Sequence, residues 1–256
     1  MDYNYHAHTV YCSHATGTAE EYIQFAIAGG IRYMGFSDHI PLRYPDGYES
    51  GYRVPYDKGQ EYVDSIKELR EKYAGQLELL VGFEMEYYPA YFEQMLQTAK
   101  DLGGEYLILG HHFLGPEHPN GHGVTHETNR FGDLLEYVDS AIEGLETGVF
   151  SYMAHPDSLF FTGSEQQYEK HMRRLCIKAR ELDIPLELNF LGMRRGRHYP
   201  AERFWKIAGE VGVPVTFGCD AHAAQHACPG ETLETAIEWV RRFKLNYIGR
   251  PKIRKL

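Results

Sequence analysis

The sequence predicts an α/β fold in which seven parallel strands curl into a distorted (β/α)7 relative of the eightfold TIM barrel. Short strand-like runs alternate with amphipathic, helix-like runs through all 256 residues. This alternation predicts parallel strands, because each helix returns the chain to the same edge of the sheet. Nearly every predicted strand ends at a histidine or a carboxylate. That pattern favours a barrel, where all strand ends meet in one ring, over a doubly wound sheet, whose site uses only a few of them.

The predicted strands are short apolar runs, and they cover residues 2–6, 33–37, 77–83, 106–110, 150–154, 185–189 and 214–218. The amphipathic stretches between and after them predict helices near residues 18–29, 57–73, 89–102, 129–146, 165–182, 200–211 and 231–243. Thr18 and Glu21 have the spacing of a capping box, which begins a helix by satisfying its free N–H groups. The glycine pairs at 29–30 and 103–104 indicate helix ends.

Two long loops, residues 40–56 and 113–128, follow the second and fourth strands and lie on the predicted functional face. Neither resembles a linker, and the chain contains no repeat or low-complexity segment. We therefore expect a single domain over residues 1–256.

Composition excludes several classes of protein. The net charge of −10 argues against binding nucleic acid, which needs a basic surface. No apolar run approaches the ~20 residues that span a membrane, and the polar residues 1–4 lead straight into the first strand, so we expect no signal peptide. The four cysteines have no C-x-x-C spacing, which argues against a thiolate zinc site or a redox pair. A reduced, cytoplasmic protein fits best.

Histidines and carboxylates at the strand ends form a candidate metal site. His6 with His8, and Asp220 with His222, are pairs two residues apart in extended segments, so each pair can direct two ligand atoms at one ion. Imidazole suits zinc, iron and manganese, and a carboxylate such as Glu84 can bridge two ions. Nine candidate ligands are enough for two to three divalent ions: His6, His8, His14, His39, Glu84, His112, His155, Asp220 and His222.

Such a site suits hydrolysis of a phosphate ester. The ester's negative oxygens repel an incoming nucleophile, and two metal ions roughly 3.5–4 Å apart cancel that charge and lower the pKa of a bridging water. Metal-assisted hydrolysis is therefore the leading interpretation.

Six motifs in order carry a family resemblance: His6-Ala7-His8-Thr9, Ser37-Asp38-His39, Gly82-Phe83-Glu84, His112-Phe113, His155-Pro156-Asp157 and Asp220-Ala221-His222. Together they resemble the polymerase and histidinol phosphatase (PHP) superfamily over essentially the full chain. The resemblance implies a distorted (β/α)7 barrel, in agreement with the strand count. The length resembles that of the stand-alone histidinol-phosphate phosphatases of histidine biosynthesis. The resemblance to these phosphatases implies hydrolysis of L-histidinol phosphate by a metal-bridging hydroxide.

The resemblance also implies how the ligands are shared. One metal would be held by His6, His8, Glu84 and Asp220, and Glu84 would bridge to a second metal held by His112 and His155. A third would be held by His14, His39 and His222. His112 is preferred to His111 because the following Phe113 matches the family register.

An arginine after the sixth strand is expected to bind the substrate phosphate, since a guanidinium can engage two phosphate oxygens at once. The resemblance favours Arg194 first and Arg195 second. The catalytic candidates are Asp220, His222, Glu84 and Arg194, and the candidate substrate contacts are Arg194, Arg195, His14 and His39.

Structural roles compete with several of these assignments. A single histidine is more often a hydrogen-bonded structural residue than a ligand, and His171 and His198 are expected to be so. Asp38 and Asp157 could cap helices or orient histidines. The role of the histidine-rich loop at 116–126 is unassigned.

Three alternative functions stay open. The first is a phosphatase or phosphodiesterase of the same fold that acts on a nucleotide, a sugar phosphate or phosphotyrosine. The second is a metal-dependent amidohydrolase, which often needs a lysine at a strand end, and none is found here. The third is a non-catalytic metal-binding module that acts through a partner.

Overall fold

The computed structural model describes residues 1–256 and contains an eight-stranded, all-parallel sheet. In sheet order its strands are β1 (Tyr3–Asn4), β2 (Tyr33–Phe36), β3 (Glu78–Glu86), β4 (Tyr106–Gly110), β7 (Phe150–Met153), β8 (Leu186–Asn189), β9 (Pro214–Gly218) and β10 (Asn246–Tyr247). The first seven correspond to the seven predicted strands. The sequence reading missed the two-residue β10, which pairs with the start of β9.

The sheet closes on itself beyond the carboxyl ends of β1 and β9. Ala7, after β1, forms a parallel bridge with Ala221, after β9. The bridge consists of two hydrogen bonds, from His8 N to Ala221 O at 2.9 Å and from Ala221 N to His6 O at 3.2 Å. The predicted distorted barrel is thus confirmed, with its closure at the end where the candidate ligands lie.

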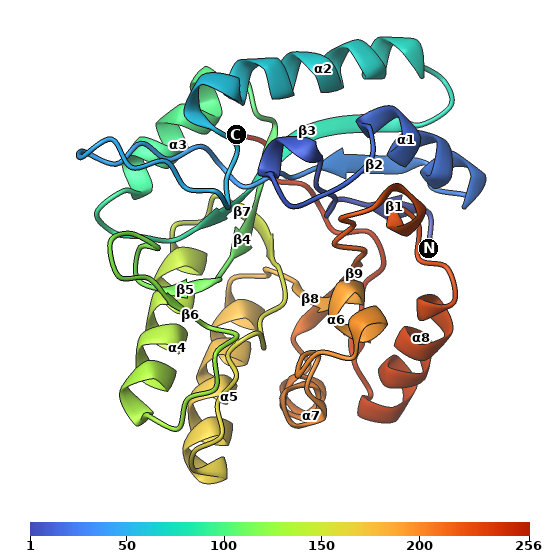
Figure 1. The fold of residues 1–256 in the computed structure, drawn as a ribbon. Helices are drawn as coiled ribbons and strands as arrows, with labels where there is room; N and C mark the ends of the chain where they lie inside the picture. The colour runs from blue at the N-terminus through green and yellow to red at the C-terminus, as the bar shows by residue number, and fades with distance from the viewer.

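The helices lie outside the sheet, where their apolar faces pack on the strands (Figure 1). They are α1 (Ala19–Ala28), α2 (Gly59–Lys72), α3 (Phe92–Asp101), α4 (Phe131–Glu146), α5 (Glu165–Glu181), α6 (Phe190–Arg195), α7 (Glu202–Val211) and α8 (Thr232–Phe243). In Figure 1, α2 and α3 lie above the strands and α4, α5 and α7 below them. None of the helices is both long and apolar enough to cross a membrane.

Local signals account for the helix boundaries. The capping box is present, because Thr18 Oγ1 accepts from Glu21 N and Glu21 Oε2 accepts from Thr18 N. The unpredicted α6 begins at Asn189, whose side-chain oxygen accepts from Gly192 N at 3.0 Å, and ends at Gly196 in the left-handed conformation. This turn of helix lies between the strand predicted at 185–189 and the helix predicted near 200–211, where the sequence predicted no element.

Three turns of 3-10 helix and one small hairpin complete the structure. The 3-10 turns are η1 (Val10–Cys12), η2 (Tyr56–Lys58) and η3 (Ala224–His226). The hairpin strands β5 (Phe113–Leu114) and β6 (His122–Gly123) lie inside the loop predicted at 113–128.

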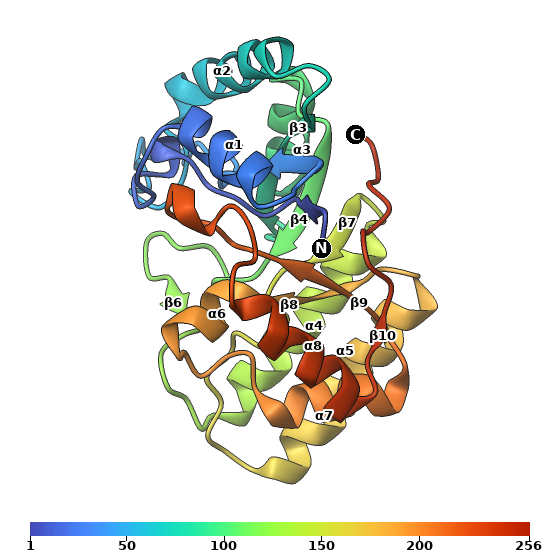
Figure 2. The ribbon, with the colours of Figure 1, turned by 90° about the vertical axis from the view of Figure 1, so that its right-hand side faces the viewer.

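The C-terminal segment covers the amino end of the barrel, opposite the ring of candidate ligands. It runs along the outside past β10 (Figure 2). Its backbone bonds to the starts of the central strands, from Leu256 N to Glu105 O at 3.1 Å and from Arg254 N to Ser151 Oγ at 3.0 Å. The cavity that the predicted ligands line is at the other, carboxyl end of the barrel.

Candidate metal centre

A cavity of about 290 Å³ lies at the carboxyl ends of the strands. Eight of the nine predicted ligands line it, namely His8, His14, His39, Glu84, His112, His155, Asp220 and His222. The ninth, His6, is fully buried beside Glu84. The barrel thus brings together residues that are up to 216 positions apart, from His6 to His222.

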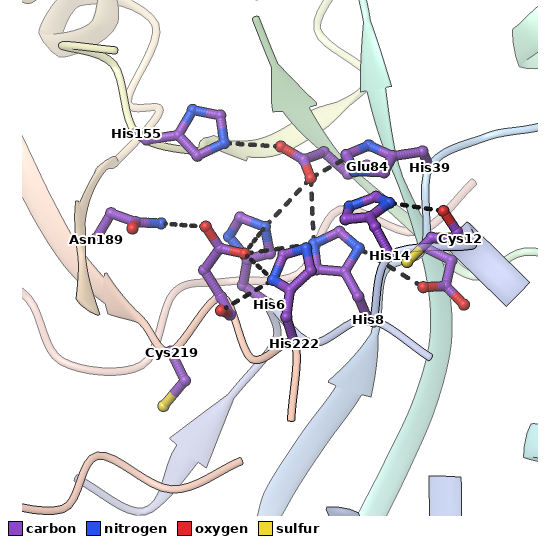
Figure 3. Close-up of polar contacts among 12 residues, drawn as sticks. His6, His8, Cys12, His14, His39, Glu84, His155, Asn189, Cys219 and His222 are labelled. Carbon is purple, nitrogen blue, oxygen red and sulfur yellow. Dashed lines mark hydrogen bonds and ion pairs between the residues drawn. The ribbon is translucent and has the colours of Figure 1, made fainter. Parts of the chain in front are cut away.

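Two imidazole nitrogens, from His6 and His8, each lie between the same two carboxylate oxygens, Glu84 Oε2 and Asp220 Oδ1 (Figure 3). His6 Nε2 lies 3.3 Å from Glu84 Oε2 and 3.6 Å from Asp220 Oδ1. His8 Nε2 lies 3.4 Å and 3.5 Å from the same two oxygens. This is the set that the resemblance implies for the first metal.

The second oxygen of Glu84 faces another pair of imidazoles. His155 Nε2 lies 3.0 Å from Glu84 Oε1, and His112 Nε2 lies 3.4 Å from it. The two oxygens of one carboxylate therefore face two separate groups of ring nitrogens, as a carboxylate bridging two ions would.

The third implied set is less compact. The rings of His14 and His222 lie 4.8 Å apart between centroids, and those of His14 and His39 lie 5.4 Å apart. However, His39 Nδ1 approaches Glu84 Oε2 at 3.5 Å, and His222 Nδ1 approaches Asp220 Oδ1 at 3.2 Å. His39 thus adjoins Glu84, His222 adjoins Asp220, and both rings lie beside His14, so the three sets share their members more than the resemblance implies.

Backbone geometry at the strand ends makes room for these carboxylates. Gly110, at the end of β4, is needed because a Cβ there would lie 2.6 Å from Glu84 Oε1. His155 and Asp220 adopt positive φ angles of 27° and 46°, which are uncommon for residues with a side chain. Such strained conformations persist where the surrounding structure imposes them, and they cluster at functional sites.

Several buried donor and acceptor atoms in the cavity have no hydrogen-bond partner. They are both ring nitrogens of His8, Nδ1 of His39 and of His155, and Oδ1 of Asp220. Buried polar atoms are normally paired, because leaving them unpaired is costly. Imidazole nitrogens and carboxylate oxygens gathered in this way fit divalent cations, which would provide the missing partners.

The charge state of the site suits cations. Burial disfavours ionised Glu84, but His112, His6 and His39 outweigh it and hold the pKa of this carboxyl well below its usual range. Asp220 behaves likewise. Burial raises its pKa, but His6, His222 and His8 lower it by more, so that the pKa lies well below its usual range. Both carboxylates are therefore anionic at neutral pH.

Comparison with known proteins supports the same interpretation. The family model described as the PHP domain matches residues 4–190. The chain belongs to the PHP family. A "probable histidinol-phosphatase" of Deinococcus radiodurans is 28% identical over 235 residues, covering 88% of this chain and 86% of that protein. The histidinol-phosphatase of Bacillus subtilis is 24% identical, covering 86% of this chain and 92% of that protein.

A solved structure shares the fold. The histidinol phosphate phosphatase of Lactococcus lactis, crystallised with zinc, L-histidinol and phosphate, superimposes with a TM-score of 0.72. The two chains are 15% identical, and the match covers 96% of this chain and 95% of that one. At this level of identity the likeness establishes the PHP barrel and its topology.

Buried polar residues that the sequence reading missed hold the ligands of this PHP centre in place. Glu187, on β8, accepts from His6 Nδ1 at 2.8 Å and from His155 N at 3.1 Å. Asn189, two residues later, donates to Glu187 and to Asp220 Oδ2, both at 3.0 Å. Polar residues at alternate positions of a central strand were the available signal, since they share one face.

Two further carboxylates lie beside histidines of the site, and one of them, Glu86, forms a hydrogen bond that orients its histidine. Glu86 Oε1 lies 2.7 Å from His112 Nδ1, which leaves His112 Nε2 to face Glu84. Asp38 accepts from Thr9 N at 2.7 Å, and its Oδ1 lies 3.6 Å from His8 Nδ1. The predicted third strand ended at residue 83, whereas β3 continues to Glu86, which is why Glu86 was missed.

The arginines after β8 are arranged differently from the expectation. Arg194 does not line the cavity, and its Nη2 donates to Cys219 O at 2.7 Å and Asp220 O at 3.3 Å. Arg195 and Arg197 do line it. This geometry favours Arg195 and Arg197 as phosphate contacts, because the Arg194 guanidinium supports the main chain that carries Asp220. The assignment of Arg194 to the phosphate stays a prediction.

The remaining wall of the cavity consists of Tyr52, Leu191 and Tyr199. Tyr52 stacks on His39 with 4.1 Å between ring centroids. No lysine lines the cavity, which does not support the amidohydrolase alternative.

Other expected structural residues lie away from the cavity. His111 stacks on Tyr137 at 4.4 Å, consistent with the choice of His112. Asp157 accepts from Trp205 Nε1 at 3.0 Å and from Ala201 N at 2.6 Å, so it anchors α7.

Proposed function

We propose that this PHP chain, acting as a single domain, is a metal-dependent phosphomonoesterase that hydrolyses L-histidinol phosphate to L-histidinol and phosphate. The observation that carries the proposal is the approach of five imidazoles to the two oxygens of Glu84, in a cavity with two arginines at its wall. The histidinol-phosphatases among its relatives, each aligned over more than four-fifths of both chains, support this substrate.

The centre would take two to three divalent ions, either zinc, manganese or iron. His6, His8, Glu84 and Asp220 would hold the first, and Glu84 with His112 and His155 the second. His14, with His39 and His222, would hold a third. When bound, such ions neutralise phosphate charge and lower the pKa of water. The zinc in the Lactococcus lactis enzyme supports zinc as one of the candidates.

The chain's own side chains would bind and orient the ester. Arg195 and Arg197 would contact phosphoryl oxygens and stabilise the charge that develops on them in the transition state. His222, whose Nδ1 lies 3.2 Å from Asp220 Oδ1, is the candidate for delivering a proton to the leaving oxygen. Tyr52 and Tyr199 offer aromatic faces to the organic half of the substrate.

The cavity size agrees with a small substrate. At about 290 Å³, it lies just below the roughly 300–1,000 Å³ that small-molecule sites occupy. The alternative is a phosphatase for another small phosphate ester. A reduced, cytoplasmic location also belongs to this proposal, and the four free cysteines support it.

Phosphate release from L-histidinol phosphate tests the proposal. The purified protein is assayed beside Glu84→Ala and with a generic aryl phosphate. Efficient turnover of histidinol phosphate that collapses in the variant is the expected result. Turnover of the aryl phosphate but not of histidinol phosphate would support phosphomonoester hydrolysis and rule out histidinol phosphate as the substrate. A strong preference for nucleotides in a wider panel of esters would favour the alternative.

A further inference from the structure

A buried arginine joins the two long loops above the metal centre. Arg53 lies in the loop between β2 and α2, yet it is only 1% exposed. Arginine is almost never fully buried unless it is paired. Its burial in a loop therefore indicates a specific set of partners.

Those partners come from three separate segments. Arg53 Nη2 donates to Glu86 Oε2 on β3 at 2.6 Å. Its Nε donates to Glu117 Oε1 at 2.5 Å, in the loop between β5 and β6. Its Nη1 donates to Ile40 O at 3.2 Å, at the start of its own loop. One guanidinium thus ties both loops to the strand that carries Glu84.

Glu86 connects Arg53 to the metal centre. One of its oxygens binds Arg53, and the other binds His112 Nδ1 at 2.7 Å. A carboxylate that accepts from one ring nitrogen fixes the tautomer and orientation of the ring, so that the other nitrogen is free to bind metal. His112 Nε2 then faces Glu84 Oε1.

The residue before Arg53 reaches the same centre. The ring of Tyr52 stacks on His39 at 4.1 Å and lies edge-on to His112 at 5.1 Å. Fixing Arg53 therefore also fixes an aromatic wall against two candidate ligands.

We infer that Arg53, with Glu86 and Glu117, is a positioning unit that orders both loops and presents His112 Nε2 to the metal pair. The inference rests on the proposed metal-dependent function. Lysine could not replace Arg53, because a single ammonium lacks the planar fork that reaches Glu86, Glu117 and Ile40 O together.

The test measures metal binding and loop order, without substrate. Zinc affinity is determined by chelator competition for the wild type, Arg53→Met, Arg53→Lys, Glu86→Gln and Glu117→Gln. Hydrogen exchange is followed in residues 40–57 and 113–128. Arg70→Met is the matched control, since Arg70 also pairs with a carboxylate, Glu105, but on the far side of the barrel from the cavity.

We expect Arg53→Met and Glu86→Gln to lower the affinity for one zinc ion by about 10- to 100-fold and to leave the affinity for the others unchanged. Both loops should exchange faster in Arg53→Met, with Arg53→Lys intermediate. Glu117→Gln should speed exchange in residues 113–128 while zinc affinity stays near that of the wild type. Arg70→Met should change neither quantity.

Wild-type zinc affinity and loop exchange in Arg53→Met and Glu86→Gln would overturn the inference. Equal weakening of every ion, together with faster exchange throughout the barrel, would also overturn it, because it would indicate a general loss of stability. Should Arg53→Met fail to fold, Glu86→Gln and Glu117→Gln decide the question. A wild type that binds zinc but does not hydrolyse histidinol phosphate would reject the proposed substrate alone, since zinc affinity is measured independently.

Discussion

The interior of the barrel has two layers with opposite chemistry. The tyrosine layer, formed by Tyr3, Tyr5, Tyr106 and Tyr152, fills the barrel below the metal centre and is at most 4% exposed. The hydroxyls of Tyr106 and Tyr3 are satisfied by the protein itself. Tyr106 donates to Tyr5 O at 2.8 Å and Phe36 O at 3.2 Å, and Tyr3 bonds with Thr216 at 3.0 Å.

The metal centre at the carboxyl ends of the same strands is not self-sufficient. Buried atoms of His8, His39, His155 and Asp220 have no partner within the protein. The contrast teaches that the tyrosine layer is built to stabilise the barrel, whereas the centre is built for something that the protein must bind. Substitutions in the two layers should therefore separate stability from activity.

The largest expected effect is at Glu84. Glu84→Ala removes the carboxylate that faces both groups of imidazoles. Losing several kcal/mol of transition-state stabilisation corresponds to a fall of about 10³-fold or more in kcat/KM. Steady-state assays with histidinol phosphate measure this, and circular dichroism checks that the fold persists. A fall below tenfold would mean that Glu84 is not central to the reaction.

The next largest effect on kcat/KM is expected at the two arginines of the cavity wall, compared with an exposed arginine. Arg195→Ala with Arg197→Ala should lower kcat/KM by roughly 10²-fold, because each removes donors for phosphoryl oxygens. Arg242→Ala is the control, since its pair with Glu202 is exposed and contributes little. Equal activity in the double variant and the control would remove the arginines from the proposed phosphate site.

A substitution in the tyrosine layer should reverse this pattern. Tyr106→Phe leaves Tyr5 O and Phe36 O without their buried donor. The free energy of unfolding should fall by about 1–3 kcal/mol, while kcat/KM of the metal-loaded protein stays unchanged. Denaturant unfolding and the phosphatase assay measure the two quantities. A large loss of activity without a loss of stability would contradict the division into two layers.

The smallest effect is expected at Tyr152, which sharpens the same comparison. Its hydroxyl is buried without a hydrogen-bond partner, unlike that of Tyr106. Tyr152→Phe removes a polar atom that is already unpaired, so the stability should stay the same or rise slightly. A loss as large as that of Tyr106→Phe would show that this hydroxyl does have a partner in solution.

Much of the fold could be predicted because its signals are local. Each of the seven predicted strands is a short apolar run in the sequence. Thr18 and Glu21 mark the start of a helix through hydrogen bonds within one turn. The elements that were missed are small. β10 has two residues, and α6 has six and depends on a cap from Asn189.

Of the candidate site, only the residues near the ends of strands could be predicted from the sequence. Most of the predicted ligands in the cavity lie near the end of a strand or within a few residues after it, so their types and order indicated a metal centre. The partners that orient them were not visible in this way, because Arg53 and Glu117 lie in two different loops, 64 positions apart in the sequence. The choice between Arg194 and Arg195 likewise depends on α6, which turns one of them toward the cavity and the other away.

Removal and return of metal tests the central claim most directly. The protein is stripped with a chelator, assayed for phosphate release from L-histidinol phosphate, and assayed again after zinc, manganese or iron(II) is restored. We predict that activity disappears in the stripped protein and returns with two to three bound equivalents of at least one of these ions. Undiminished hydrolysis by a protein shown to be free of metal would contradict the account.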